Sequence, residues 1–153
     1  EYKNVYDLDY TILRYGSLYG PRSGEDNGLY RIVRDALVRG SISYEGDPDS
    51  IREYIHVEDA AYASAKALGS EFLNQSVILT GRQSVRVNDL LSMLAEILGF
   101  EGLPQFRGEN YAGHYVRTPY AYQPKLGRKY SPSIHVDLGQ GLLQLIDEVR
   151  QQF

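Results

Sequence analysis

The sequence predicts an α/β fold, because segments of strand length alternate with segments whose apolar residues recur at helical spacing. Its 153 residues are enough for one compact domain and leave no room for two. No internal repeat and no low-complexity tract divides the chain. We therefore expect residues 1–153 to form one domain, or one piece of a domain.

Three strands and two helices are expected in the first half of the chain. The strands are short, mostly apolar runs bounded by Gly, Pro and Asp, over residues 9–15, 42–45 and 53–57. Apolar residues at helical spacing predict a helix over 27–39, and Gly40 stands where a helix ends. A second, alanine-rich helix is expected over 58–68, where Glu58 and Asp59 place negative charge at its positive amino end.

The second half continues the alternation and then interrupts it. A buried strand is expected over 76–80, and a helix over 87–98 ends at Gly99. The following thirty or so residues are rich in Gly, Pro and Tyr and show no period, so we expect an irregular crossing. The chain then closes with a predicted strand over 134–136 and a helix over 138–149.

Composition excludes several classes of function. The net charge is -4 and the sixteen Lys and Arg residues are scattered, so the chain lacks the clustered basic surface of a nucleic-acid binder. No run of about 18 apolar residues could cross a bilayer. The absence of cysteine excludes disulfides, thiolate zinc sites and thiol nucleophiles. The histidines His56, His114 and His135 are too separated to suggest a metal site, and we interpret His56 as a structural residue of a buried strand.

Two segments carry a family resemblance. Residues 13–22, LRYGSLYGPR, resemble the loop after the sixth sheet strand of extended short-chain dehydrogenases/reductases, and residues 52–60, REYIHVEDA, resemble their downstream Arg-Asp-Tyr-Ile-His-Val-Asp-Asp signature. The chain is thus similar to the NAD-dependent epimerase/dehydratase family, of the nucleotide-sugar epimerase kind. This resemblance implies the last strands of a Rossmann fold followed by a small mixed α/β substrate-binding domain. It also implies that an amino-terminal Rossmann half is absent.

Two family features are missing from the sequence. No Gly-x-x-Gly-x-x-Gly turn is present to approach a dinucleotide pyrophosphate. A Tyr-x-x-x-Lys pair occurs once, at Tyr62 and Lys66, but it follows the second signature, whereas the family's catalytic pair precedes the first. We interpret Tyr62 and Lys66 as i,i+4 neighbours on a helix and predict no catalytic residue in this chain. The resemblance places the true pair just before Glu1, on a helix that residues 1–5 finish.

The resemblance also implies roles for individual residues. Tyr15 and Leu18 are expected on the cofactor side and Ser17 on the substrate side. Many relatives have Asn in place of Ser17, and the Asn side chain reaches farther than the Ser hydroxyl. The alternative is that residues 15–21 form only a strand-ending turn. Arg52 matches an arginine that binds the substrate diphosphate in relatives, a role that suits a bidentate guanidinium. Asn27 matches an asparagine that contacts the same diphosphate.

Each diphosphate assignment has a structural alternative. For Arg52 the alternative is a surface ion pair with Asp47, Asp49 or Glu53. For Asn27 the alternative is a role only as the N-cap of the following helix. A second phosphate-binding arginine is expected in the irregular crossing, where Arg117 or Arg107 would serve.

Two further features concern aromatic residues. Relatives usually place an aromatic residue directly before Gly46, where this chain has Glu45, so the sequence does not identify the nucleobase. Five tyrosines crowd the crossing, and packing is a more common use of such residues than ligand stacking; they are Tyr111, Tyr115, Tyr120, Tyr122 and Tyr130.

The resemblance implies a parent protein that is a cytoplasmic, homodimeric, NAD-dependent nucleotide-sugar epimerase or dehydratase. We expect this chain alone to be inactive and to bind no NAD, which the intact parent would use. Its expected ligand is a nucleotide sugar, with no nucleic-acid or membrane partner. The alternatives are a non-catalytic module that binds a nucleotide sugar or dinucleotide, and one subunit of a split enzyme completed by a separate Rossmann half.

Overall fold

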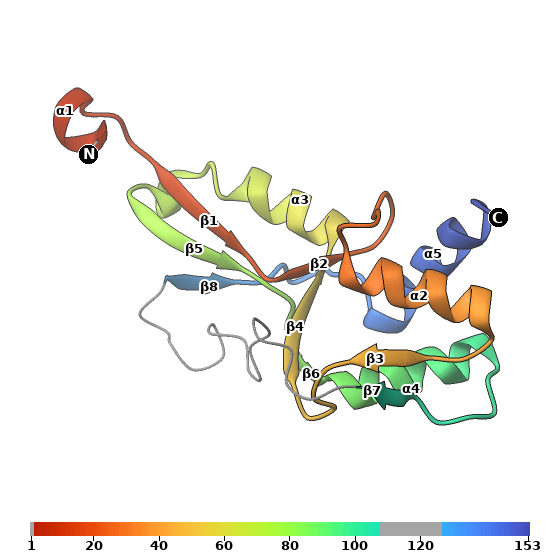
Figure 1. The fold of residues 1–153 in the computed structure, drawn as a ribbon. Helices are drawn as coiled ribbons and strands as arrows, with labels where there is room; N and C mark the ends of the chain where they lie inside the picture. The colour runs from red at the N-terminus through yellow and green to blue at the C-terminus, as the bar shows by residue number, and fades with distance from the viewer. Residues whose placement is uncertain (1, 108–126) are drawn as a thin grey trace.

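The computed structural model describes residues 2–107 and 127–153, and it confirms the α/β prediction. Figure 1 shows two small sheets that meet near the middle of the molecule. The first sheet is parallel and has the order β1-β5-β8, formed by Thr11–Tyr15, Gln75–Leu79 and Arg128–Tyr130. The second has the order β2-β4-β6, formed by Ser17–Tyr19, Ile51–His56 and Ser84–Arg86. A separate parallel pair joins β3 (Ser43–Glu45) to β7 (Gln105–Arg107).

The chain passes from the first sheet to the second at Gly16, between β1 and β2 (Figure 1). The Gly16 N–H still donates to the carbonyl of Leu79 at 2.8 Å, so the crossing begins inside the first sheet. A Cβ at this position would lie 2.6 Å from Thr80 Oγ1 and 2.9 Å from the carbonyl oxygen of Glu53. Glycine therefore permits the close approach of the two sheets.

The helices cover the sheets in two groups. Figure 1 shows α3 along the first sheet, whereas α2, α4 and α5 gather at the opposite end of the molecule and α1 lies apart beyond the start of β1. Their bounds are Tyr2–Tyr6 for α1, Gly28–Arg39 for α2, Val57–Lys66 for α3, Val87–Leu98 for α4 and Leu138–Arg150 for α5, with a short 3-10 turn over Ser70–Phe72.

The apolar side chains form two cores that match these groups. The larger core joins α2, α4 and α5 through fully buried residues, among them Val33, Leu94 and Leu142. The smaller core lies between α3 and the first sheet, where Ala63 and Val77 are fully buried. The second sheet and its loops lie between the two cores. They carry polar side chains that line a cavity.

The helices predicted over 27–39, 87–98 and 138–149 are confirmed to within a residue at each end. The predicted strand over 134–136 is wrong: that segment is irregular, and Ile134 is 89% exposed. The Val136 N–H donates to the carboxylate of Asp59 rather than to a neighbouring strand, because the segment already leads into the N-cap of α5. The three-residue strands β7 and β8 were not predicted.

Some predictions concern residues 108–126, which lie outside the described part of the chain. They are the roles of Arg117, His114 and the tyrosines Tyr111, Tyr115, Tyr120 and Tyr122. The fifth tyrosine, Tyr130, lies on β8 and packs edge-on against Phe72, with ring centroids 5.5 Å apart. Among the helices of residues 2–107 and 127–153, none is both long and apolar enough to cross a membrane.

Candidate functional site

A cavity of about 790 Å³ opens between the start of α2, strands β2 and β4, and the β3–β7 pair. We call it the α2 cavity. It brings together four of the six residues that the resemblance assigned to cofactor or substrate: Ser17, Leu18, Asn27 and Arg52. Arg107 also lines it, and so do Tyr44, Glu45 and Tyr54.

Arg52 extends from β4 into this cavity and is partly buried. One of its guanidinium nitrogens donates to the carbonyl of Ile51 at 3.0 Å. The three carboxylates that the sequence offered as surface partners are engaged elsewhere. Asp49 pairs with Arg86 at 3.5 Å, Glu53 pairs with Lys129 at 3.0 Å, and Asp47 accepts the backbone N–H of Asp49 at 2.8 Å.

Both polar atoms of the Asn27 side chain, Oδ1 and Nδ2, form hydrogen bonds within the protein. Its Oδ1 accepts the N–H groups of Leu29 and Tyr30, each at 3.0 Å, which is the N-cap role considered from the sequence. Its Nδ2 donates to the carbonyl of Leu18 at 2.8 Å. Asn27 therefore fixes the amino end of α2 against β2 at the wall of the cavity, where the helix dipole favours an anion.

The two residues expected on the cofactor side lie apart. Leu18 lines the α2 cavity and is 39% exposed. Tyr15 does not line it; its hydroxyl shares a 2.7 Å hydrogen bond with Ser64 on α3. Arg117 lies outside the described residues. The rejected pair, Tyr62 and Lys66, lies on the exposed face of α3 and lines neither of the two cavities described here.

Sequence reasoning missed several residues of the cavity. Tyr54 stands two positions after Arg52 on β4, so both point to the same side of the strand. Burial, with a smaller contribution from Tyr44, raises the pKa of Tyr54 to about 12. Three charged residues of α2, Arg31, Asp35 and Arg39, also line the cavity. Their i,i+4,i+8 spacing was the available signal, since it places them on one face of the helix.

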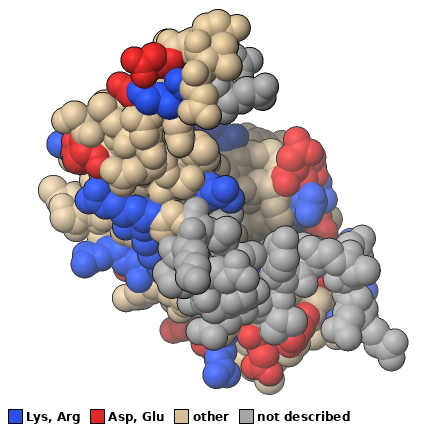
Figure 2. Space-filling view, turned by 90° about the vertical axis from the view of Figure 1, so that its left-hand side faces the viewer, with Lys and Arg blue, Asp and Glu red and all other residues tan. Residues whose placement is uncertain are grey.

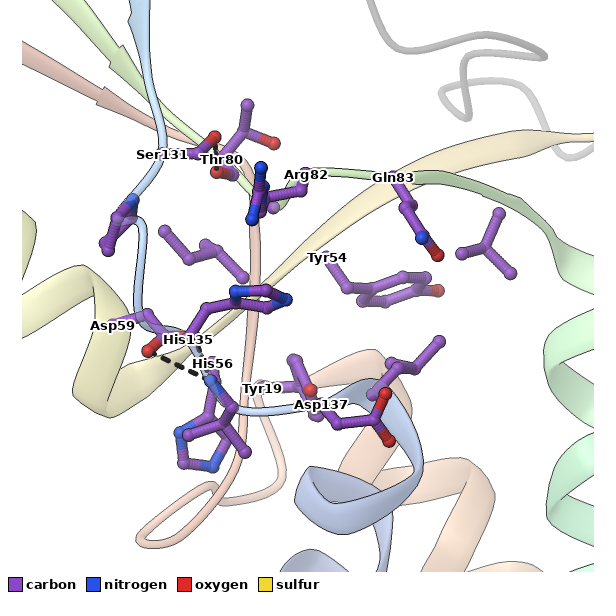
Figure 3. Close-up of a pocket in the computed structure, with 16 residues that line it drawn as sticks. Tyr19, Tyr54, His56, Asp59, Thr80, Arg82, Gln83, Ser131, His135 and Asp137 are labelled. Atoms are coloured by element: carbon purple, nitrogen blue, oxygen red, sulfur yellow. Dashed lines mark hydrogen bonds between the residues drawn. The ribbon is translucent and has the colours of Figure 1, made fainter.

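A second, smaller cavity of about 90 Å³ lies where the two sheets meet the start of α5 (Figure 3). Asp59 accepts the N–H of Val136 there at 3.2 and 3.0 Å, which holds the segment before α5 against α3. Burial, and then the charges of Asp59 and Asp137, raise the pKa of the Tyr19 hydroxyl. Because its polar groups tie neighbouring segments together, we assign this cavity a structural role.

His56 also belongs to the lining of this smaller cavity. It is 1% exposed, as expected of a structural histidine in a buried strand. Its Nδ1 accepts the N–H of Glu58 at 3.4 Å at the start of α3. A Cβ at Gly20 would lie 2.6 Å from its Nε2, so the ring is packed directly against the loop after β2. Across the described residues, no group of three or more His, Asp or Glu side chains is placed to hold a metal ion.

An arginine and the capped amino end of a helix stand at the wall of a polar cavity beside the parallel strands β2 and β4, and phosphorylated ligands bind at such helix ends in many α/β domains. The model of the NAD dependent epimerase/dehydratase family matches residues 1–78, half of the sequence. The chain therefore belongs to this family, and the resemblance seen in its two signatures is confirmed.

Curated relatives agree with this assignment. The chain is 24% identical over 141 residues to a UDP-glucuronate 4-epimerase of Thermodesulfobacterium geofontis, covering 90% of this chain and 43% of the relative. It is 32% identical over 106 residues to a putative UDP-glucose 4-epimerase of Methanocaldococcus jannaschii, covering 66% of this chain and 33% of the relative. The chain thus spans less than half the length of these relatives.

Solved structures share the fold. A UDP-glucose 4-epimerase of Thermotoga maritima, solved with UDP-glucose, has a TM-score of 0.77 and 26% identity, covering 99% of this chain and 49% of that chain. A UDP-glucuronic acid 4-epimerase of Bacillus cereus, in complex with a fluorinated UDP-sugar and NAD, has a TM-score of 0.82 and 24% identity, covering 99% and 48%. This chain therefore has the fold of about half of each enzyme.

Proposed function

We propose that this chain is the nucleotide-sugar-binding portion of an NAD-dependent sugar epimerase or dehydratase. The observation that carries the proposal is the α2 cavity, which gathers Ser17, Leu18, Asn27 and Arg52 at the amino end of a helix. Relatives of this fold include UDP-sugar epimerases, which supports a nucleotide sugar as the ligand.

The residues of the cavity suit the parts of such a ligand. The guanidinium of Arg52 provides a permanently charged, forked donor for diphosphate oxygens. Asn27 holds the amino end of α2 in place, so that the helix dipole acts on the same charge. The Ser17 hydroxyl can donate to and accept from a sugar hydroxyl. NAD, when bound in the intact protein, would supply the transient oxidation of the sugar.

The edge of the first sheet suggests where a Rossmann half would sit. Within the described residues β1 pairs only with β5, so its other edge is open, and the unpaired N–H and C=O groups of an open edge can pair with a further strand. Exposed apolar side chains precede β1 or lie on it: Val5, Tyr6, Leu8, Tyr10 and Ile12. Figure 2 shows the side of the molecule that lies on the left in Figure 1, where an uncharged area lies next to a group of Lys and Arg side chains. We propose that a Rossmann half covers this edge, supplied by the same polypeptide or by a partner subunit.

The proposal implies that the chain alone binds ligand without turning it over. The intact protein is then expected to be a cytoplasmic homodimer. The sequence encoded immediately upstream of Glu1 would separate a catalytic parent from a binding module. A Gly-x-x-Gly-x-x-Gly turn and a Tyr-x-x-x-Lys pair there indicate the parent enzyme, whereas their absence favours the module.

Calorimetric titration of the chain with UDP and UDP-glucose tests the site. We expect a dissociation constant in the micromolar to millimolar range, weakened in Arg52→Ala by roughly tenfold or more, because charge-assisted hydrogen bonds are worth about 1.5–3 kcal/mol. Arg86→Ala is the matched control, since Arg86 lies on the adjacent strand outside the α2 cavity. Equal affinities of the wild type and Arg52→Ala would refute the phosphate assignment.

A further inference from the structure

The β3–β7 pair places a carboxylate and a guanidinium side by side at the wall of the α2 cavity. Glu45 and Arg107 are direct register partners on these two parallel strands, and register partners project from the same face of a sheet. Both residues are exposed and both line the cavity. They come from segments about sixty residues apart in the sequence, so only the fold reveals that they are neighbours.

The packing beneath these strands fixes their spacing. Tyr44 and Phe106, the preceding register pair, pack edge-on with ring centroids 6.3 Å apart and lie against the larger core. Gly46 follows with a φ of +148°, and a Cβ there would lie 2.7 Å from the Tyr44 ring. The backbone that carries Glu45 is therefore held by Tyr44 on one side and by β7 on the other.

The charged groups of Glu45 and Arg107 make few contacts within the described residues. No hydrogen bond or ion pair of the Glu45 side chain is found in residues 2–107 and 127–153. Arg107 makes one long hydrogen bond of 3.4 Å, to Gln105 Oε1. Glu45 and Arg107 are neighbours on the two strands, but in this part of the chain their charged groups do not form an ion pair with each other. Two acceptor oxygens and a forked donor thus face the cavity next to one another.

We propose that Glu45 and Arg107 read the nucleobase and that the cavity prefers guanine; this rests on the proposed function, the binding of a nucleotide sugar. Guanine presents two adjacent donors, N1–H and the N2 amino group, which match the two oxygens of a carboxylate. Its O6 and N7 acceptors match an arginine. No other base offers both features in full.

The other bases fit this pair less well. Uracil has a single N3–H between two carbonyl oxygens. When one oxygen of a carboxylate accepts this N–H, the other lies against a uracil carbonyl oxygen and is repelled by it. Cytosine and adenine each offer one amino group to Glu45. The preference therefore departs from the uridine nucleotides named for the relatives. It follows from the position of Glu45 beside its register partner Arg107 at the wall of the cavity.

Titration of the chain with GDP, CDP, UDP and ADP tests the inference. We expect GDP to bind about tenfold or more tighter than UDP, the scale of one good bidentate base contact. Glu45→Gln should bring the two affinities within about twofold, since the amide cannot accept both donors. Glu101→Gln, which removes an exposed carboxylate outside the cavity, is the matched control and should leave the ratio unchanged.

The outcomes separate the base preference from the proposed function. Binding of UDP as tight as GDP, or tightest binding of CDP or ADP, overturns the guanine preference while leaving a nucleotide site in place. Arg107→Ala should weaken GDP more than UDP; an equal loss for both assigns Arg107 to phosphate and overturns its part in base reading. Failure of all four nucleotides to bind refutes the proposed function itself.

Discussion

Replacing Lys129 with Met tests the ion pair that joins the two sheets. Lys129 on β8 donates to both carboxylate oxygens of Glu53 on β4, at 3.0 Å each. The Glu53 side chain is 3% exposed and also accepts from the hydroxyls of Thr80 and Ser84, each at 3.1 Å. The Lys129→Met variant leaves the carboxylate buried with two neutral donors and no cation from β8.

The expected cost follows from the burial of the two partners. Breaking a fully buried pair costs about 3–5 kcal/mol, whereas an exposed pair is worth about 0–1 kcal/mol. The Lys129 side chain is 44% exposed, so solvent screens part of the interaction. We therefore expect Lys129→Met to lower the free energy of unfolding by about 2 kcal/mol. Glu53→Gln should cost less, because the lysine it leaves unpaired can reach water.

Urea unfolding followed by circular dichroism measures both variants and the Glu53→Gln/Lys129→Met double variant. The double variant should recover part of the stability lost in Lys129→Met, because it no longer buries an uncompensated charge. The reasoning is refuted if Lys129→Met costs less than about 0.5 kcal/mol, the scale of an ordinary surface substitution. A double variant less stable than Lys129→Met would refute it as well.

Two further predictions concern single side chains. Asn27→Ala should lower the free energy of unfolding by about 1–2 kcal/mol through loss of the α2 cap, whereas Asn27→Asp keeps the capping oxygen and should cost less in the same urea titration; equal losses would argue against capping as the cause. Because the folded-state pKa of Tyr54 is raised from 10.0 to about 12, the folded state holds this proton more tightly than the unfolded state. Its stabilisation is complete below pH 10 and is lost as the pH rises to about 12, so the wild type should lose about 2–3 kcal/mol more than Tyr54→Phe over that range. Parallel pH profiles of the two proteins would contradict the assignment.

Elements with local signals were predictable from the sequence. The helix over Gly28–Arg39 begins after a capping asparagine and ends at Gly40, whose φ of 67° is the left-handed conformation that glycine adopts readily. These signals need no knowledge of the rest of the chain. The strands β7 and β8 have no comparable signal, because each is three residues long and pairs with a strand distant in sequence. Tertiary pairing decides such strands, and sequence periodicity does not contain it.

The residues of the candidate site also divide into those that the sequence predicts and those that depend on tertiary pairing. Ser17, Leu18 and Arg52 came from the two contiguous signatures and Asn27 from its position at the start of a predicted helix, and the fold places all four at one cavity. The pairing of Glu45 with Arg107 depends on the register between β3 and β7. The predicted strand over 134–136 failed for a related reason: a carboxylate on α3, rather than a neighbouring strand, accepts the backbone N–H of Val136.

Strand β4 connects the binding site to the junction between the sheets. Its side chains alternate, so Arg52 and Tyr54 face the α2 cavity while Glu53 between them reaches Thr80 and Lys129. A change at Lys129 therefore acts on the strand that carries Arg52 without touching the cavity. Weaker nucleotide binding in Lys129→Met would be accompanied by lower stability. The Arg52→Ala variant keeps the ion pair of Glu53 with Lys129, so its loss of nucleotide binding does not depend on that pair.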